Sequence, residues 1–310
     1  MTSTSTLNPA LHRKEYLVGL TIAISGAVLF STKAIIAKLI YRYNVDAVTL
    51  IAFRMLFSLP IFAAIAFWQA RQGFPLSWAD RARLVVLGLM GYYLSSFLDF
   101  LGLQYITAGL ERLILFLTPS FVLLISATFL KRRISGLEWA ALTVSYMGIV
   151  LVFLHDLKFG GSDVMLGSLM VLGAASSYAL YLIQSGQLVT RMGSMRLVSY
   201  AMCVSSAACI GQFFVLRPTS MLVQPAAVYW LSLANAIFCT VLPVFMTMIA
   251  VQRIGAATAS QAGMIGPVST LFLGAIFLGE PITGWQLAGT ALVVGGMYLL
   301  SMKKNSVASA

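Results

Sequence analysis

The feature that most constrains this chain is a stretch of sequence that occurs twice. Residues 104–151 and 252–299 align without a gap at an offset of 148 positions. Each copy has two long apolar runs joined by a short turn, and a proline occupies the same place in both, as Pro119 and Pro267. An internal repeat constrains the architecture of a whole chain, so it is interpreted before any single segment. The pattern predicts two similar helical units in tandem.

The composition places these units in a lipid bilayer. Hydrophobic residues make up 60% of the 310 residues, charged residues make up 9%, and the mean hydropathy is +0.92. In soluble globular proteins, about a quarter of all residues are charged. Apolar runs of about 20 residues, which span a hydrocarbon core of about 30 Å, recur along the chain. The sequence therefore predicts an all-α, multi-pass membrane protein.

Ten transmembrane helices are predicted, in two sets of five, with short connections that carry turn residues. The first five lie near 16–40, 47–69, 84–104, 109–130 and 137–154, and the second five near 164–188, 197–216, 226–251, 256–278 and 284–301. We therefore predict a first five-helix repeat at 16–155, a second at 156–302, an N-terminal tail at 1–15 and a C-terminal tail at 303–310.

The basic residues predict how the helices are oriented. With the N-terminus in the cytoplasm, the inner segments hold thirteen lysines and arginines and the outer segments hold four, a bias that is typical of cytoplasmic loops. The inner ones are Arg13, Lys14, Arg71, Arg81, Arg83, Lys131, Arg132, Arg133, Arg191, Arg196, Arg253, Lys303 and Lys304, and the outer ones are Lys38, Arg42, Lys158 and Arg217. Both termini are expected in the cytoplasm. The net charge of +11 follows from this topology, so no nucleic-acid partner is expected.

A unit with five crossings is odd, so its second copy must be inverted relative to the first. The turn between the fourth and fifth spans, Lys131-Arg132-Arg133, then faces the cytoplasm. The matching turn in the second copy, Gly279-Glu280-Pro281, faces outward and lacks the basic residues. Two inverted repeats that meet near the middle of the membrane are typical of an alternating-access transporter, whose site lies at their interface.

Three motifs of the second copy resemble a known family. Ile265-Gly266-Pro267, Phe277-Leu278-Gly279-Glu280-Pro281 and the run from Gly289 to Gly296 resemble the EamA-type members of the drug/metabolite transporter superfamily. The layout of ten spans in two copies extends the resemblance over nearly the whole chain. The resemblance implies a secondary transporter of the inner (cytoplasmic) membrane, often an exporter of amino acids or other small metabolites. It does not imply one substrate.

One position departs from the family's pattern. The family usually carries a glutamate after the fourth span as well as after the ninth, whereas Arg132 stands at the position that matches Glu280. A role that needs both glutamates is therefore not expected here. Glu280 alone is predicted to accept hydrogen bonds from the amides that open the tenth span.

Five charged residues lie within the predicted spans, all in the first repeat and toward its outer side: Lys33, Arg54, Asp99, Glu111 and Arg112. A charge in a span costs a few kcal/mol on insertion scales, so it usually faces the bundle interior and marks a pathway or relay. The five add to +1, which suits a bound carboxylate. Two interpretations stay open. In one, the charges are structural or gating groups: Asp99 forms an internal ion pair with Arg54 or Arg112, and others reach the interface. In the other, Asp99 or Glu111 takes part in proton coupling or substrate binding.

Several uncharged groups in the spans are candidates for lining a substrate cavity. The prolines remove a helix hydrogen bond, and the freed carbonyls are tolerated beside a cavity. Packing kinks for the prolines and interfacial belts for the tyrosines are the alternatives. The candidates are Tyr92, Tyr178, Asn235, Gln261, Pro119 and Pro267.

The sequence contains no recognisable catalytic or phosphate-binding motif. Its two histidines, His12 and His155, lie in a tail and a connection, and no zinc-protease pair, Walker loop or nucleophile elbow occurs. The three cysteines lie in apolar runs without the spacing of metal ligands. We expect no enzyme activity, metal or cofactor. A small-molecule solute is the expected partner, joined by protons if a carboxylate titrates. A membrane scaffold, an intramembrane enzyme and a channel are the alternatives, and the oligomeric state is left open.

Overall fold

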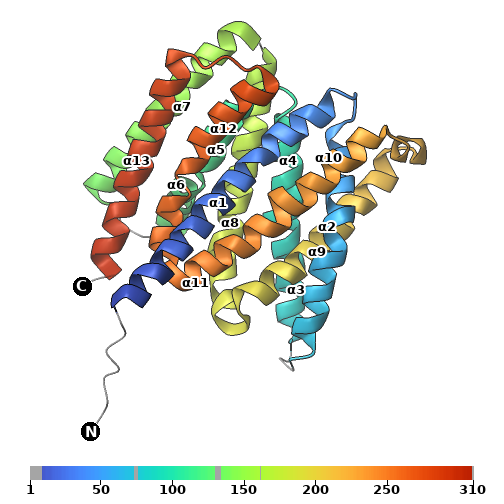
Figure 1. The fold of residues 1–310 in the computed structure, drawn as a ribbon, viewed down its shortest axis with the longest axis horizontal. Coiled ribbons are helices and arrows are strands. Elements are labelled where there is room, and N and C mark those ends of the chain that lie inside the picture. The colour runs from blue at the N-terminus through green and yellow to red at the C-terminus, as the bar shows by residue number, and fades with distance from the viewer. Residues whose placement is uncertain (1–8, 73–75, 130–133, 161, 309–310) are drawn as a thin grey trace.

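The computed structural model describes residues 9–72, 76–129, 134–160 and 162–308, which form helices and connections without a β-strand (Figure 1). The first half contains α1 (Pro9–Tyr41), α2 (Ala47–Ala70), α3 (Trp78–Gly88), η1 (Leu89–Leu94), α4 (Ser95–Gly102), α5 (Ala108–Phe116), α6 (Thr118–Phe129) and α7 (Gly136–Gly160). The second half contains α8 (Ser162–Met192), α9 (Ser194–Leu216), η2 (Thr219–Leu222), α10 (Ala226–Ala236), η3 (Ile237–Val241), α11 (Leu242–Ala262), α12 (Ile265–Leu273), η4 (Gly274–Leu278) and α13 (Gly284–Ala308).

The predicted all-α membrane fold is confirmed. Within the described ranges, nine helices are long and apolar enough to cross a membrane, and the shorter apolar helix Gly284–Leu300 supplies the tenth. The helices α1 and α3 begin earlier than predicted, at Pro9 and Trp78. The early start of α3 has a local cause: Asp80 N donates to Ser77 Oγ over 3.1 Å, and Ser77 N donates to Asp80 Oδ2 over 3.3 Å. This capping box holds a polar first turn that hydropathy alone does not identify as helical.

The last helix of each repeat opens with the same cap. Before α7, Ser135 N donates to Glu138 Oε2 over 2.8 Å, and Glu138 N donates to Ser135 Oγ over 3.4 Å. Before α13, Thr283 and Gln286 exchange the equivalent two hydrogen bonds, both 3.3 Å long. The repeat therefore extends to individual hydrogen bonds. The predicted cytoplasmic turn Lys131-Arg132-Arg133 lies outside the described residues.

The fourth and ninth spans are interrupted within two residues of equivalent places. The chain leaves the helix between α5 and α6, and again between α11 and α12. Pro119 and Pro267 follow these breaks, each in the first turn of the next half-helix. A proline is tolerated there because the first amides of a helix have no intrahelical acceptor. Gly255, with a φ of 77°, adopts a left-handed conformation that favours glycine, and it separates the eighth span from the ninth.

The third and eighth spans share a less common feature. Each contains a π-helical segment, η1 in the third span and η3 in the eighth, and the two segments begin 148 positions apart. Such segments widen the helix locally and are frequent at functional sites. Here they lie beside the site described below.

The helices pack in pairs that the repeat relates to each other. The fifth span α7 packs against the tenth, α13, and α2 packs against its equivalent α9. The first span, α1, packs against α12 of the second repeat, as α8 packs against α6 of the first. In Figure 1, α7 and α13 lie side by side at one edge, and the beginning of α1 lies at the same end as the end of α13. These pairs are those of two inverted five-helix repeats.

Small residues make the closest of these contacts. A Cβ on Gly148 of α7 would lie 2.6 Å from Gly289 O of α13. The symmetry-related contact joins Gly296 and Ala141, where a Cβ on the glycine would lie 2.7 Å from Ala141 O. Close backbone approach at small residues is a common way for membrane helices to associate. The glycine-rich run of the second copy is therefore a packing surface.

Candidate functional site

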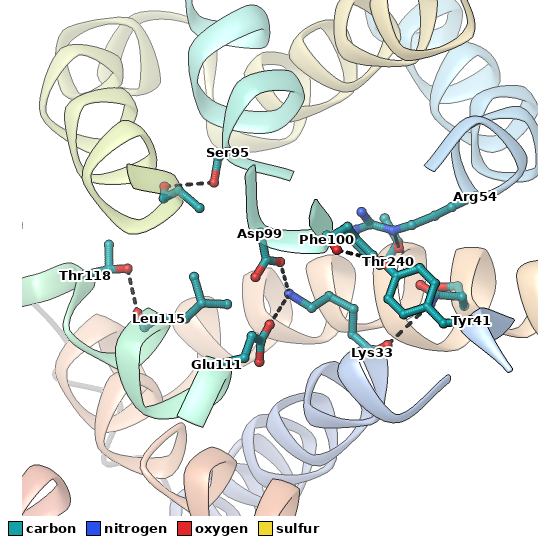
Figure 2. A network of polar contacts seen from close by, with 12 residues as sticks. Lys33, Tyr41, Arg54, Ser95, Asp99, Phe100, Glu111, Leu115, Thr118 and Thr240 are labelled. Atoms are coloured by element: carbon teal, nitrogen blue, oxygen red, sulfur yellow. Dashed lines mark hydrogen bonds and ion pairs between the residues drawn. The ribbon is translucent and has the colours of Figure 1, made fainter. Parts of the chain in front are cut away.

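The first repeat brings three of its intramembrane charges together (Figure 2). Lys33 on α1 extends between Asp99 on α4 and Glu111 on α5. Its Nζ donates to Asp99 Oδ2 in an ion pair and lies 3.0 Å from Glu111 Oε1. All three side chains are at most 6% exposed. One ammonium group therefore bridges two buried carboxylates, and Asp99 pairs with Lys33 rather than with Arg54 or Arg112.

Arg54 on α2 connects this part of the molecule to the second repeat. Its Nε donates to Thr240 Oγ1 of η3 over 2.8 Å, and the Thr240 hydroxyl donates to Asn235 O over 3.1 Å. The Arg54 guanidinium carbon lies 5.0 Å from the ring centroid of Phe100, a distance typical of a cation–π contact. Both repeats therefore position this arginine.

Arg112 on α5 reaches the second repeat at a different helix. Its guanidinium carbon lies 4.9 Å from the ring centroid of Phe30. A Cβ on Gly266 of α12 would lie 2.6 Å from Arg112 Nη2, so the glycine leaves room for the guanidinium. This contact gives a physical reason for Gly266 in the Ile265-Gly266-Pro267 motif.

These residues border a cavity of about 300 Å³ between the two repeats. Ligand pockets usually enclose about 300–1,000 Å³, so this cavity suits a small molecule. Lys33, Arg54, Asp99 and Arg112 contribute charges to its wall, and hydroxyl groups, aromatic rings and aliphatic side chains complete it. Glu111 lies behind Lys33 and is fully buried.

An aromatic cluster forms another part of the wall. Tyr92 in η1 and Tyr178 on α8 both border the cavity, and their ring centroids lie 6.3 Å apart at an angle of 73°. Behind them, the hydroxyl of Tyr181 lies 3.2 Å from that of Tyr92. The Tyr181 ring packs directly on Gly91, where a side chain would leave no space. The aromatic cluster thus connects the third and sixth spans.

The other predicted cavity residues lie behind or beside the wall. Asn235 is completely buried, and its Nδ2 lies 3.5 Å from Lys33 O. Gln261 is half-buried near the end of α11, Pro119 is exposed and Pro267 is buried. The residue before the first proline, Thr118, borders the cavity instead.

Sequence reasoning missed three wall residues that the repeat points to. Phe30, Thr240 and Met202 all border the cavity. At the offset of 148 positions they are the equivalents of Tyr178, Tyr92 and Arg54, which had been predicted. Applying the offset to each candidate would have found them. Ser95 and Ser96, which also border the cavity, carry no such signal.

The prediction that Glu280 accepts hydrogen bonds from the amides that open the tenth span is wrong. Its Oε1 accepts from Ala108 N at the beginning of α5, over 3.1 Å, and lies 3.7 Å from Lys38 Nζ of α1. The amides that open α13 are instead served by the cap described above. After Gly279, which has a φ of 73°, the chain turns back, and Glu280 reaches the first repeat. Arg132, at the matching position, lies outside the described residues.

A bundle of two inverted five-helix repeats around a buried, charged cavity defines a multi-pass membrane transporter. The model of the EamA-like transporter family matches residues 17–154 and again 165–302, at the same offset as the internal repeat. The chain belongs to this family, as the resemblance predicted.

Two bacterial proteins are among those similar to this chain. The uncharacterized transporter YcbK of Bacillus subtilis (strain 168) is 30% identical over 307 residues, which cover 94% of this chain and 96% of that protein. A probable amino-acid metabolite efflux pump of Escherichia coli (strain K12) is 26% identical over 62% of this chain and 67% of that protein. One crystal structure superposes with a TM-score of 0.65 at 17% identity, covering 94% of this chain and 98% of that one, and supports the fold.

Proposed function

We propose that this protein is a secondary transporter that exports small organic metabolites, such as amino acids, from the cytoplasm. The observation that carries the proposal is the cavity, because both repeats contribute its wall and buried charges border it. In this proposal the two repeats, at 16–155 and 156–302, rock relative to each other and open the cavity to one side of the membrane at a time. The name of the Escherichia coli relative supports efflux as the direction.

The proposed location is the inner (cytoplasmic) membrane, with both termini in the cytoplasm. The excess of lysine and arginine in the segments assigned to the inside supports this orientation. The bacterial relatives support the choice of membrane.

Proton exchange at Asp99 or Glu111 is proposed as the driving force. Lys33 contacts both carboxylates, so a proton on either one removes one of its two ionic partners. The ammonium group then shifts its contact toward the carboxylate that stays ionised. Because the three residues come from α1, α4 and α5, this shift changes the contacts among three helices.

Solute efflux from proteoliposomes that contain the purified protein, with and without a pH gradient, tests the proposal. The proteoliposomes are first loaded with amino acids. Efflux is then compared for the unaltered protein, Asp99→Asn and Glu111→Gln. At least one of these variants is expected to lose the stimulation by the pH gradient. Asp163→Asn, which changes an exposed carboxylate at the beginning of α8, is the matched control.

Gradient-stimulated efflux that survives both substitutions would rule out proton coupling at these carboxylates. If the folded protein moves none of a broad set of small metabolites, transport itself is excluded and a membrane scaffold becomes the better explanation.

A further inference from the structure

The buried cations and carboxylates around the cavity are unevenly paired. Lys33 is in contact with Asp99 and Glu111, so these three groups together carry one negative charge when ionised. Arg54 and Arg112 border the same cavity, and within the described chain neither forms an ion pair with a carboxylate. The site as a whole therefore carries one uncompensated positive charge.

Both arginines also carry nitrogen atoms that lack acceptors. Arg54 Nη1 and Arg112 Nε are buried and donate to no acceptor among the residues that the structure describes. An unsatisfied, buried cationic donor is costly, and a ligand that supplies an anionic acceptor removes this cost. Carboxylates suit this role because they form short, charge-assisted hydrogen bonds with guanidinium groups.

The rest of the wall favours an apolar group next to that anion. Tyr92 and Tyr178 present aromatic rings, and Leu115, Phe116 and Met202 are apolar. Burial of an apolar ligand surface against such rings and aliphatic groups makes the free energy of binding more favourable. The volume of about 300 Å³ limits the ligand to a small molecule.

We propose that the cavity recognises a small carboxylate with an apolar or aromatic tail, and that Arg54 and Arg112 bind its carboxylate group. That this ligand is transported rests on the proposed function, whereas its binding to the cavity does not. The single negative charge of such an anion cancels the uncompensated positive charge, whereas a zwitterion leaves it. An amino acid is then held through its carboxylate, and its ammonium group weakens binding because it adds a positive charge to a site that already carries one.

An ammonium group is the competing occupant, because Asp99 Oδ1 is also buried without a hydrogen-bond partner in the described chain. Asp99, however, already forms an ion pair with Lys33, while the two arginines have no carboxylate. The charge balance therefore favours an anion over a cation at this site.

The test compares four ligands that share one aromatic ring: phenylpropionate, its amide, phenylalanine and phenethylamine. Their equilibrium binding to the purified full-length protein in lipid nanodiscs is measured by calorimetry. Phenylpropionate is expected to bind about 10-fold or more tightly than the amide, which keeps the shape but loses the charge. Phenylalanine is expected to bind more weakly than phenylpropionate, and phenethylamine not at all.

Three variants test whether this preference depends on the two arginines. Arg54→Gln and Arg112→Gln are expected to reduce the preference for the acid over the amide at least about 10-fold, and Arg54→Lys to keep part of it. Arg71→Gln changes an arginine at the end of α2 that lies over Phe67, away from the cavity, and should leave the preference unchanged.

Equal binding of acid and amide by the unaltered protein would overturn the inference, and this comparison needs no variant to fold. Tighter binding of phenylalanine or phenethylamine than of phenylpropionate would overturn it as well, in favour of ammonium recognition. Binding of the acid without measurable flux would support the inference while contradicting the proposed function. Flux of other solutes without any binding of the acid would support the proposed function while contradicting the inference.

Discussion

The two repeats differ in the residues at three equivalent positions. Lys33, Asp99 and Glu111 of the first repeat correspond, at the offset of 148 positions, to Tyr181, Thr247 and Ala259 of the second. In the first repeat, an ammonium group bridges two carboxylates. The equivalent of that lysine, Tyr181, instead makes a hydroxyl contact with Tyr92 of the first repeat.

The comparison separates what the duplication kept from what it changed. Helix breaks, π-helical segments and capping boxes recur in both copies, whereas the charged residues that border the cavity all belong to the first. Because the repeats are inverted, equivalent positions belong to opposite halves of the bilayer. The contacts around Lys33 are therefore ionic, whereas those around Tyr181 are aromatic and contain no carboxylate.

Lys33→Met should give the largest effect, because it leaves Asp99 and Glu111 buried without their cation. A loss of about 3–5 kcal/mol in the free energy of unfolding is expected, with loss of transport. Tyr181→Phe, at the equivalent position, removes only a neutral contact and should cost about 1 kcal/mol. Thermal unfolding in detergent, followed by tryptophan fluorescence, measures both.

The triple variant Lys33→Met, Asp99→Asn, Glu111→Gln provides the control for charge. It removes the unpaired carboxylates and should recover most of the lost stability. If Lys33→Met is as stable as Tyr181→Phe, the two repeats do not differ energetically in the way that their contacts indicate.

Thr240→Val and Tyr92→Phe compare hydrogen bonds at a second pair of equivalent positions. Thr240→Val removes an acceptor from the buried Arg54 guanidinium and should cost about 2–3 kcal/mol. Tyr92→Phe removes a bond between two neutral hydroxyls and should cost about 1 kcal/mol. Unfolding midpoints of the two purified variants decide the order, and a larger loss for Tyr92→Phe would contradict the comparison.

Gly148→Ala and Gly296→Ala test the part that both repeats share. Each added methyl group meets backbone of the facing helix at the crossing of α7 and α13. We expect similar losses of about 1–2 kcal/mol for both. Gly295→Ala adds a methyl group to open space and should be neutral or slightly stabilising. Clearly unequal losses for the two buried glycines would show that the crossing is not symmetric.

Glu280→Ala should have the smallest effect in this series. It removes the acceptor of Ala108 N and the partially exposed pair with Lys38, for a loss of about 1 kcal/mol in unfolding free energy. Glu280→Gln keeps an oxygen for the amide and should lose less. A null result for Glu280→Ala would mean that this residue does not hold the two repeats together.

The sequence predicted the architecture well, because hydropathy and an internal repeat both act over long stretches of chain. It also predicted that the intramembrane charges would gather, since an isolated charge in lipid is costly. It could not predict that Lys33 contacts both carboxylates while the arginines have none. That pairing depends on where side chains from α1, α2, α4 and α5 end, which no local pattern encodes.

The predictions that the structure confirmed only in part, or not at all, have a common cause. Asn235 and Gln261 are polar residues in spans, but the sequence does not tell which side of a helix faces the cavity when all sides are apolar. Glu280 was assigned to the nearest free amides, whereas it bonds to a helix that is distant in the sequence. Local capping rules identify a good acceptor but do not identify its donor.

The reach of Glu280 across the repeats has a mechanical consequence. Ala108 opens α5, and Glu111 and Arg112 lie in the first turn of the same helix. Any displacement of the turn before α13 therefore pulls directly on the helix end that carries two of the buried charges. The carboxylate of Glu280 thus provides a route by which movement of that turn would reach the charged residues at the beginning of α5.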